Sequence, residues 1–305
     1  MFYVNAYIAS KEITMVNTTI SPLLRFMLGL CRKWPFRGRA KIIRAMASRF
    51  SELQSFPASI SPTTEMRLDL RDDAAIGIFL HGCLPHENGL KAIMTSFLNQ
   101  NDVFYDIGAN HGYYTLIFSE KIYNLAQVVA FEPNPSLANE LRLNTFSREN
   151  VYIIPVGLSD QTKLSFLYYD ACRSDTANFR SGSSGNSIEV PLNTLDTLLK
   201  QGQIRPANVV KMDVEGLEYK VLQGYTLRDE HEPAIFMEWL DDFSSEVDAT
   251  FQDLQQLLGC NWVIYRIENT GKLRQEGIEK AGSTNDLLLV KRDSHYHQLA
   301  QNLIG

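Results

Sequence analysis

The sequence predicts an α/β fold: a doubly wound, mostly parallel sheet with helices on both faces. Short apolar runs alternate with segments of helical spacing, which is typical of parallel strands joined by crossover helices. One complete strand–turn–helix–strand unit lies between Asp102 and Glu132. The last two apolar runs are joined by a polar connection containing Gly271 and Gly277, which indicates antiparallel pairing at the end of the sheet.

The expected elements follow the chain in order. Before the central unit we expect an amphipathic helix at Arg39–Phe50, a linker around Pro57 and Pro62, strands at Arg67–Leu70 and Gly77–His81, and a helix at Leu90–Asn99. After it we expect a helix at Ser136–Asn144 capped by Ser136, strands at Val151–Val156, Leu164–Tyr169 and Ile188–Leu192, and a flexible loop at 173–187. The remaining strands are expected at Val209–Met212, Ala234–Met237, Trp262–Ile267 and Asp286–Lys291, with helices at Leu195–Leu199, Glu218–Leu222 and Phe251–Leu258.

Charge is distributed unevenly along the 305 residues. Residues 1–51 contain nine Lys and Arg but one acid, Glu12, so a total charge of −6 leaves −14 on the rest of the chain. An acidic body argues against nucleic acid as the main partner. We expect a basic, partly helical extension at 1–60, one α/β domain at 61–295 and a tail at 296–305.

The basic extension has two interpretations. Ile42, Ile43, Met46 and Phe50 lie on one side of the expected helix, so the helix either packs on the domain or makes a peripheral contact with anionic lipid or a lipid-linked substrate. The four cysteines are isolated, which favours a reducing compartment. No apolar stretch reaches the roughly 18–20 residues of a membrane span, and the start lacks a signal-peptide pattern. We therefore expect a cytoplasmic protein, with membrane-peripheral contact as an alternative.

The turn after the first central strand points to a nucleoside without a phosphate. A dinucleotide fingerprint beginning at Gly108 would need glycine where Asn110 and Tyr113 stand. Asp106, at the strand end, would repel a pyrophosphate and attract a cationic group. Glu132 ends the next strand and is suited to accept hydrogen bonds from ribose hydroxyls.

S-adenosylmethionine combines a ribose, a cationic arm and no phosphate. Asp106 is expected near its ammonium group, Gly108 and Gly112 allow the backbone to approach it, and Glu132 binds the ribose. The full set of expected cofactor-binding residues is Asp106, Gly108, Asn110, Gly112, Tyr113, Glu132, Gly157, Leu158 and Ser159, the last three flanking the adenine. Singly, each acid could equally be a helix cap or a surface residue, and each glycine could serve only the turn.

Three segments together resemble the FkbM-type methyltransferases. They are Asp106–Tyr114 (DIGANHGYY), Phe131–Pro135 (FEPNP) and Val210–Glu218 (VKMDVEGLE), extended by Val221–Gly224 and Ile235–Glu238. The resemblance covers roughly Gly77 to Lys291. It implies a class I, Rossmann-like sheet of seven strands with the last one antiparallel, and O-methylation of a hydroxyl on a sugar, glycan or secondary metabolite. The alternatives are a non-catalytic adenosyl-binding or scaffold protein and, disfavoured by Asn110 and Tyr113, a nicotinamide-dependent oxidoreductase.

Four residues are candidates for assisting the transfer of a methyl group to a poorly nucleophilic hydroxyl. Asp213 is the preferred general base or Mg²⁺ ligand, and Glu215 is either a second metal ligand or a helix cap. His111 has an ordinary pKa suited to base catalysis, but it could also stack on the cofactor or face solvent. Glu238 faces either the acceptor pocket or a buried partner. The loops at 82–89 and 173–187 are expected walls of the acceptor pocket, and the sequence indicates no oligomeric state.

Overall fold

The computed structural model describes residues 20–84, 88–122, 126–170, 172–179, 186–240, 249–275 and 284–304. The helices are α1 (Pro22–Lys33), α2 (Arg39–Arg49), α3 (Asp73–His81), α4 (Asn88–Phe97), α5 (Tyr113–Lys121), α6 (Pro135–Thr145), α7 (Leu195–Lys200), α8 (Glu218–Gln223), α9 (Arg228–His231), α10 (Phe251–Leu258) and α11 (His295–Gln301), with a 3-10 helix η1 (Ser51–Ser55). The described part of the chain contains no helix with the length and apolar character needed to cross a bilayer.

The main sheet has the order β13-β12-β14-β11-β10-β3-β4-β5. Its strands are β3 (Val103–Ile107), β4 (Gln127–Phe131), β5 (Val151–Ile154), β10 (Val209–Met212), β11 (Ala234–Leu240), β12 (Trp262–Ile267), β13 (Leu273–Arg274) and β14 (Thr284–Lys291). The five strands from β5 to β11 are parallel, and β14 runs antiparallel to both β11 and β12. The predicted seven-stranded plan with an antiparallel last strand is confirmed. The two-residue β13 adds an eighth strand at the edge, and β14 lies between β11 and β12 instead of at the edge.

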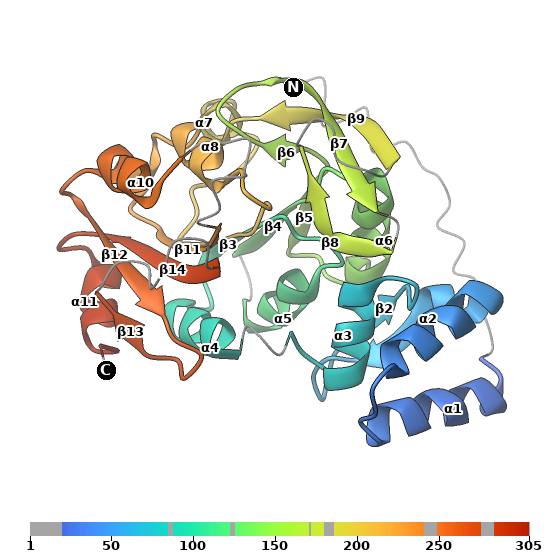
Figure 1. Cartoon of the computed structure of the whole chain (residues 1–305). Coiled ribbons are helices and arrows are strands. Elements are labelled where there is room, and N and C mark those ends of the chain that lie inside the picture. The colour runs from blue at the N-terminus through green and yellow to red at the C-terminus, as the bar shows by residue number, and fades with distance from the viewer. Residues whose placement is uncertain are drawn as a thin grey trace.

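Helices cover both faces of this sheet, as predicted (Figure 1). Alternate residues of a strand point to opposite faces, so Phe104 enters the core shared with α4, α5 and α11, whereas Tyr105 enters the core shared with α7, α8 and α10. The same alternation repeats at Val209 and Val210 in β10. The central strands are therefore buried on both sides, which accounts for their unbroken apolar runs.

A second sheet of four strands lies between β5 and α7 in the chain. It contains β6 (Gly157–Leu158), β7 (Lys163–Asp170), β8 (Arg173–Asn178) and β9 (Asn186–Asn193) in the order β6-β9-β7-β8. Figure 1 shows this sheet at the top of the molecule, away from α11. The predicted flexible loop at 173–187 is wrong for residues 173–178, which form β8 against β7. Residues 180–185 of that loop lie outside the described residues.

The N-terminal elements form a layer of their own at the lower right of Figure 1. The strands β1 (Phe56–Ser59) and β2 (Glu65–Leu68) pair as a hairpin where the linker was predicted, and α1 and α2 both contact α3. The predicted strand Gly77–His81 is wrong, because these residues belong to α3. The side chain of Asp72 accepts a hydrogen bond from the amide of Ala75 and begins this helix.

Two further local predictions are corrected by the structure. Helix α6 is capped by Asn134, whose side chain accepts from the amide of Ser136, and Pro135 occupies the first helical position. Helix α2 buries Ile43 and Met46 as expected. Ile42 and Phe50, however, remain 44% and 40% exposed, so the apolar face of α2 is divided between the core and the surface.

Candidate functional site

A cavity lies over the carboxyl ends of β3, β4 and β10. The turn between β3 and α5 forms its floor, and α3 and β8 contribute Ala74, Ile78, Ser174 and Ala177 to its walls. Of the predicted residues, those that line the cavity are Gly108, Asn110, His111, Tyr113, Glu132, Gly157, Leu158, Asp213 and Glu215. Asp106, Gly112, Ser159 and Glu238 are not part of its lining. The predicted wall at 82–89 supplies Leu84, whereas residues 85–87 lie outside the described residues.

The turn of the β3–α5 unit is held close to its neighbours. Gly108 has a φ of +78°, and a Cβ atom there would lie 1.9 Å from the carbonyl oxygen of Asp213. Gly112 has a φ of +91°, and its Cβ would lie 2.3 Å from Leu141 Cδ1 on α6. Glycine is therefore required at both positions by backbone conformation and by packing, and Gly112 shapes the turn from behind the cavity.

Asn110 stands at the centre of this turn with a φ of +51°. Its backbone amide donates to Glu132 Oε2 at 2.8 Å, and its side-chain Oδ1 is buried without a hydrogen-bond partner. A buried amide oxygen that lacks a partner is costly unless a ligand or water supplies a donor. The floor of the cavity therefore presents an acceptor that is suited to a ligand.

Glu132 is fixed by two backbone amides. Its Oε1 accepts from Asn134 and its Oε2 accepts from Asn110, both at 2.8 Å, and the side chain is buried. Burial raises the pKa of Glu132 to about 7, and the nearby charge of Asp106 acts in the same direction. Each carboxylate oxygen has a second lone pair, so Glu132 retains the capacity to accept two hydroxyl donors.

Asp106 lies behind the cavity instead of in its wall. Its Oδ2 accepts a hydrogen bond of 2.5 Å from Thr115 Oγ1, whereas Oδ1 is buried without a partner. Burial raises the pKa of Asp106, and the charge of Lys211, its register partner on β10, opposes that rise. Asp106 is therefore not among the lining residues that a ligand would contact directly.

Lys211 carries a positive charge into the interior of the sheet. Its ammonium Nζ lies 2.9 Å from Asp213 Oδ2 and 5.1 Å from the centre of the Tyr114 ring, and the residue is buried. A buried ammonium group needs a partner, and Asp213 supplies one.

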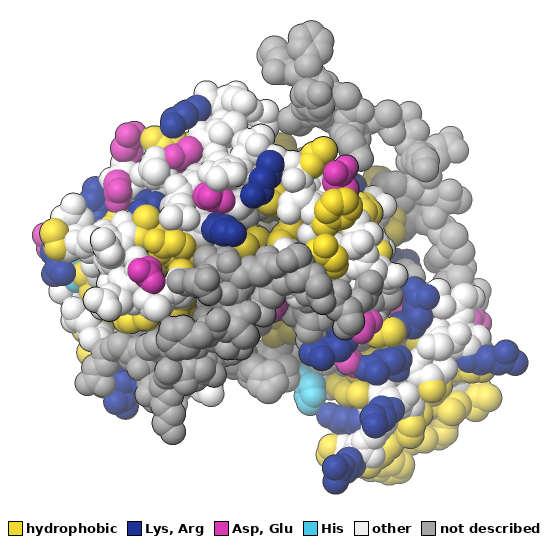
Figure 2. Space-filling model, turned by 45° about the horizontal axis from the view of Figure 1, so that its top comes forward, with side chains coloured by type: hydrophobic (Ala, Val, Ile, Leu, Met, Phe, Trp, Pro, Cys, Tyr) yellow, Lys and Arg dark blue, Asp and Glu magenta, His cyan; other side chains and the backbone are white. Residues whose placement is uncertain are grey.

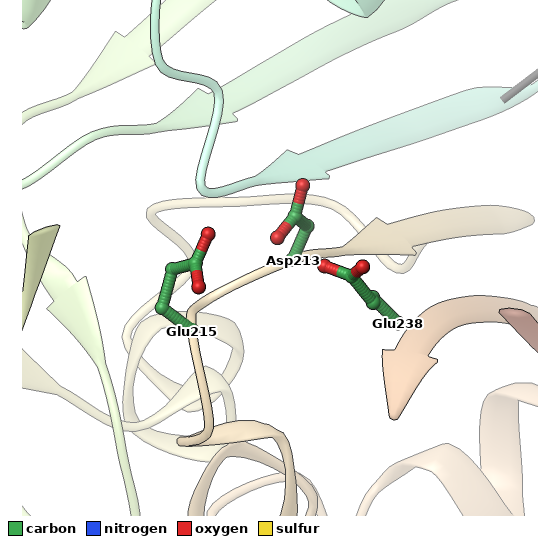
Figure 3. A group of neighbouring side chains, drawn as sticks. All are labelled: Asp213, Glu215 and Glu238. Atoms are coloured by element: carbon green, nitrogen blue, oxygen red, sulfur yellow. The ribbon is translucent and has the colours of Figure 1, made fainter. Parts of the chain in front are cut away.

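Three carboxylates meet beside this ion pair, two from the turn after β10 and one from within β11. Ligand oxygens of Asp213, Glu215 and Glu238 all lie within 4.8 Å of one another. In Figure 3, Glu215 and Glu238 approach Asp213 from its two sides. Burial, together with the charges of Asp213, Glu215 and Asp286, raises the pKa of Glu238 to about 9. Like charges at this separation favour a bound proton or a bound cation.

The turn after β10 holds Glu215 in an unusual conformation. Glu215 has a φ of +54° and Gly216 a φ of +98°, a left-handed conformation that is costly for a residue other than glycine. Glu218 holds this turn: its buried carboxylate accepts from the amides of Val214 at 2.9 Å and Gly216 at 3.4 Å. Glu218 therefore stabilises the turn before α8, for which the described residues supply no side-chain cap, and Glu215 extends toward Asp213 (Figure 3).

His111 is enclosed by groups from three other elements. Its Nδ1 lies 3.0 Å from Glu140 on α6, and its Nε2 lies 3.0 Å from Asp72 at the start of α3 and 3.2 Å from Ser174 Oγ on β8. Burial alone would lower the pKa of His111, but its hydrogen bonds to the two carboxylates raise the pKa to about 10. At neutral pH the ring is an imidazolium that donates from both nitrogens. Both ring nitrogens are engaged by Asp72 and Glu140, which disfavours the role considered for His111 as a general base, because a base needs a free lone pair.

The enclosed imidazolium makes stability depend on pH. A His111→Gln variant is expected to be about 3–5 kcal/mol less stable than the parent at pH 6, because it leaves Asp72 and Glu140 without their buried cation. The folded-state pKa of His111 lies above its ordinary value of 6.5, so its contribution is complete below pH 6.5 and declines as pH rises toward 10.

Urea unfolding of both proteins at several pH values between 6 and 10 measures this effect. The difference in unfolding free energy should shrink steadily with rising pH. A difference that is equal at pH 6 and pH 10 would show that His111 is neutral in the folded protein. His295→Gln, on α11, is the matched control.

Comparison with known proteins agrees with this geometry. Residues 106–267, just over half of the chain, match the family described as the methyltransferase FkbM domain. The chain belongs to the FkbM methyltransferase family. It is also 32% identical over 140 residues to the hexuronic acid methyltransferase AglP of Haloferax volcanii, a match that covers 46% of this chain and 56% of that protein. The matched part therefore spans little more than half the length of this relative.

The solved structures that match are more distant in sequence. A putative rRNA methylase from Clostridium thermocellum is 10% identical, with a TM-score of 0.40, and the match covers 67% of this chain and 97% of that one. Fibrillarin from Aeropyrum pernix, solved with bound S-adenosylmethionine, is 10% identical, with a TM-score of 0.39, and the match covers 68% and 75%.

Two further parts of this FkbM family member, Val221–Gly224 and Ser159, lie outside the cavity lining and pack behind it. A Cβ atom at Gly224 would lie 2.1 Å from the carbonyl oxygen of Ser159, so glycine at this position allows the end of α8 to pack closely on the backbone that follows β6. Ser159 itself donates to Asp160 Oδ1 through its hydroxyl and to the carbonyl of Asn193 through its amide. Its buried position behind the cavity fits a structural role.

Sequence reasoning missed several residues of the site. Asp286 lies opposite Glu238 in the β11–β14 register and adds a fourth carboxylate near the cluster. This position could have been found, because a last strand that runs antiparallel begins at the edge where the parallel strands end. Asp72, Glu140 and Ser174, which enclose His111, had no comparable local signal.

Proposed function

We propose that this protein is an S-adenosylmethionine-dependent O-methyltransferase whose acceptor is a sugar or glycan hydroxyl. The observation that carries the proposal is the charge of the cavity over the β3–α5 turn. Its described lining contains the carboxylates Glu132, Asp213 and Glu215 but no arginine, and its two cations, Lys211 and His111, are already paired with carboxylates. Such a cavity repels a pyrophosphate and suits a cationic nucleoside.

The residues of the cavity fit S-adenosylmethionine. Glu132 would accept the ribose hydroxyls, the unpartnered Asn110 Oδ1 offers an acceptor on the floor, and Gly108 keeps that floor free of side chains. Leu158 and Phe179 provide apolar surface for the adenine. Asp106, which lies behind the turn, is proposed to act through its charge and not by direct contact. When bound, the cofactor supplies a methyl group that is already activated, so the protein mainly positions the acceptor.

Asp213 is proposed as the group that prepares the acceptor hydroxyl. It lines the cavity at the end of β10, it is partly exposed, and Lys211 holds its carboxylate in place from the side. A carboxylate at this position can accept the proton as the acceptor oxygen loses it. Glu215 and Glu238 complete a set of oxygen donors of the type that Mg²⁺ prefers. A divalent cation held there would lower the pKa of an acceptor hydroxyl.

The glycan acceptor is supported by the likeness to a hexuronic acid methyltransferase. The cavity itself favours an uncharged or weakly charged sugar face, because its acids would repel an unpaired carboxylate. A scaffold protein without activity is disfavoured by the three converging carboxylates, since such a cluster destabilises a fold that does not use it.

Calorimetric titration of the whole protein tests the cofactor assignment. We expect S-adenosylmethionine to bind with a Kd on the order of 1–100 μM, within the usual range for enzyme substrates, and NAD to show no heat of binding. Incubation with a panel of sugars and glycans that includes hexuronic acids should then yield S-adenosylhomocysteine. Binding of NAD in place of S-adenosylmethionine would reject the proposal, and cofactor binding without turnover on any acceptor would favour the scaffold alternative.

A further inference from the structure

Helix α1 carries apolar side chains on two of its sides. One side packs into the core through Leu24, Leu28 and Cys31. A second side points outward and consists of Leu23, Phe26, Met27 and Leu30, continued by Trp34 at the end of the helix. These positions recur every three or four residues, so they form one continuous stripe. Leu23, Phe26 and Trp34 are 66%, 64% and 60% exposed.

Cations border this stripe and no carboxylate lies within the segment. Residues 20–51 contain eight Lys and Arg and no Asp or Glu, although the rest of the chain is strongly acidic. Figure 2 shows hydrophobic and basic side chains gathered together over the N-terminal helices. The patch, which we call the N-terminal basic face, comprises the outward stripe of α1, the exposed Phe36 and Ile42, and the cations Arg25, Lys33, Arg37 and Lys41.

Seven of these eight cations fall into two groups. Arg32 lies 5.9 Å from the ring centre of Phe79 and Arg44 forms an ion pair with Asp73, so both contact α3, whereas Arg39 donates a hydrogen bond to the carbonyl of Cys31 and joins α2 to α1. Arg25, Lys33, Arg37 and Lys41 are exposed, and their positions suit contact with an external partner. The N-terminal basic face is thus rigidly joined to α3, whose Ala74 and Ile78 line the cofactor cavity.

We propose that the N-terminal basic face docks on an anionic membrane surface. An amphipathic helix with Trp and Phe on its outer side and Arg and Lys beside them inserts its apolar side chains at the headgroup boundary, while the cations attract acidic lipids. Nucleic acid would match the charge, but its phosphates would leave Leu23, Phe26 and Met27 uncovered. Self-association through the same face would bring the cations of two copies together, which is unfavourable.

Vesicle flotation with the full-length protein tests this inference. We expect binding to vesicles in which about a third of the lipid is phosphatidylserine, and at least tenfold weaker binding to pure phosphatidylcholine. An Arg25→Gln/Lys33→Gln/Arg37→Gln/Lys41→Gln variant should lose at least tenfold in binding to the acidic vesicles. A Phe26→Ser/Trp34→Ser variant should lose a similar factor, and its residual binding should depend more steeply on salt.

Matched controls lie elsewhere on the surface. Phe146→Ser removes a phenyl ring that is 72% exposed, and Lys163→Gln/Lys200→Gln removes exposed cations outside the N-terminal basic face. Both should bind vesicles like the parent. Circular dichroism and S-adenosylmethionine affinity confirm that each variant folds, and vesicle binding itself requires no activity.

Three outcomes would overturn the proposal. The first is equal binding to acidic and neutral vesicles. The second is that the parent fails to bind vesicles but binds a DNA duplex tightly, and that the Arg25→Gln/Lys33→Gln/Arg37→Gln/Lys41→Gln variant loses this DNA binding. The third is that the parent does not bind vesicles and forms a stable dimer in light scattering, whereas the Phe26→Ser/Trp34→Ser variant is a monomer.

Discussion

An Asp213→Asn variant is expected to lose methyl transfer by about 10²–10⁴-fold, the usual contribution of a positioned general base, while it binds S-adenosylmethionine with nearly unchanged affinity. The reason is that the asparagine amide keeps the size of the side chain but cannot accept a proton. Lys211 then loses its ion-pair partner, so thermal unfolding must be compared with that of the parent. Turnover is measured as S-adenosylhomocysteine formed on a sugar acceptor that the parent methylates.

The effect of a chelator on turnover by the parent separates the two roles considered for Asp213, general base and Mg²⁺ ligand. If it acts as a base alone, the parent remains active in the presence of a chelator. If Asp213, Glu215 and Glu238 hold Mg²⁺, the chelator abolishes parent turnover and added Mg²⁺ restores it. Asp160→Asn, next to Ser159 and outside the cavity lining, is the matched control and should keep parental activity. Parental turnover in Asp213→Asn would remove Asp213 from the mechanism.

A Glu132→Gln variant is expected to bind S-adenosylmethionine on the order of 10–100-fold more weakly than the parent, because it loses charge-assisted hydrogen bonds to the ribose. The affinity of the parent should also depend on pH. Since burial raises the pKa of Glu132 to about 7, the residue is largely protonated at pH 6 and largely charged at pH 8. Ribose hydroxyls donate to the charged form, so affinity should rise by about tenfold across that interval.

Calorimetry on parent and variant at both pH values measures the two effects together. The variant should lack the rise in affinity between pH 6 and pH 8 that is due to Glu132. Glu149→Gln changes an exposed glutamate away from the cavity and should behave like the parent. A variant with parental affinity at pH 8 would exclude Glu132 from ribose binding.

The central unit could be predicted because its signals are local. Val103–Tyr105 is buried on both faces, and Glu132 directly follows β4, whereas β3 runs one residue beyond Asp106. By contrast, the segment Gly77–His81 is too short to distinguish the two-residue hydrophobic period of a strand from the 3.6-residue period of a helix. The deciding residue was Asp72, whose carboxylate accepts from the amide of Ala75 and begins a helix.

The surroundings of His111 could not have been predicted in the same way. Its partners Asp72 and Glu140 are 39 and 29 residues distant in the chain and belong to different elements. A histidine inside a cofactor turn has an ordinary pKa until those two carboxylates are placed beside it. The sequence placed His111 in the turn and left base catalysis, cofactor stacking and solvent exposure open, whereas the fold buries its ring between two carboxylates that raise its pKa to about 10.

The wall that α3 contributes to the cavity shows which part of the chain can reshape it. Ala74 and Ile78 precede the family-matched segment, which begins at residue 106, yet they border the same space as Glu132 and Asp213. The β3–α5 turn and the three carboxylates come from within the segment, whereas one side of the cavity comes from chain that lies before it. Substitutions at Ala74 and Ile78 can therefore alter the shape of the cavity without changing any residue of the family-matched segment.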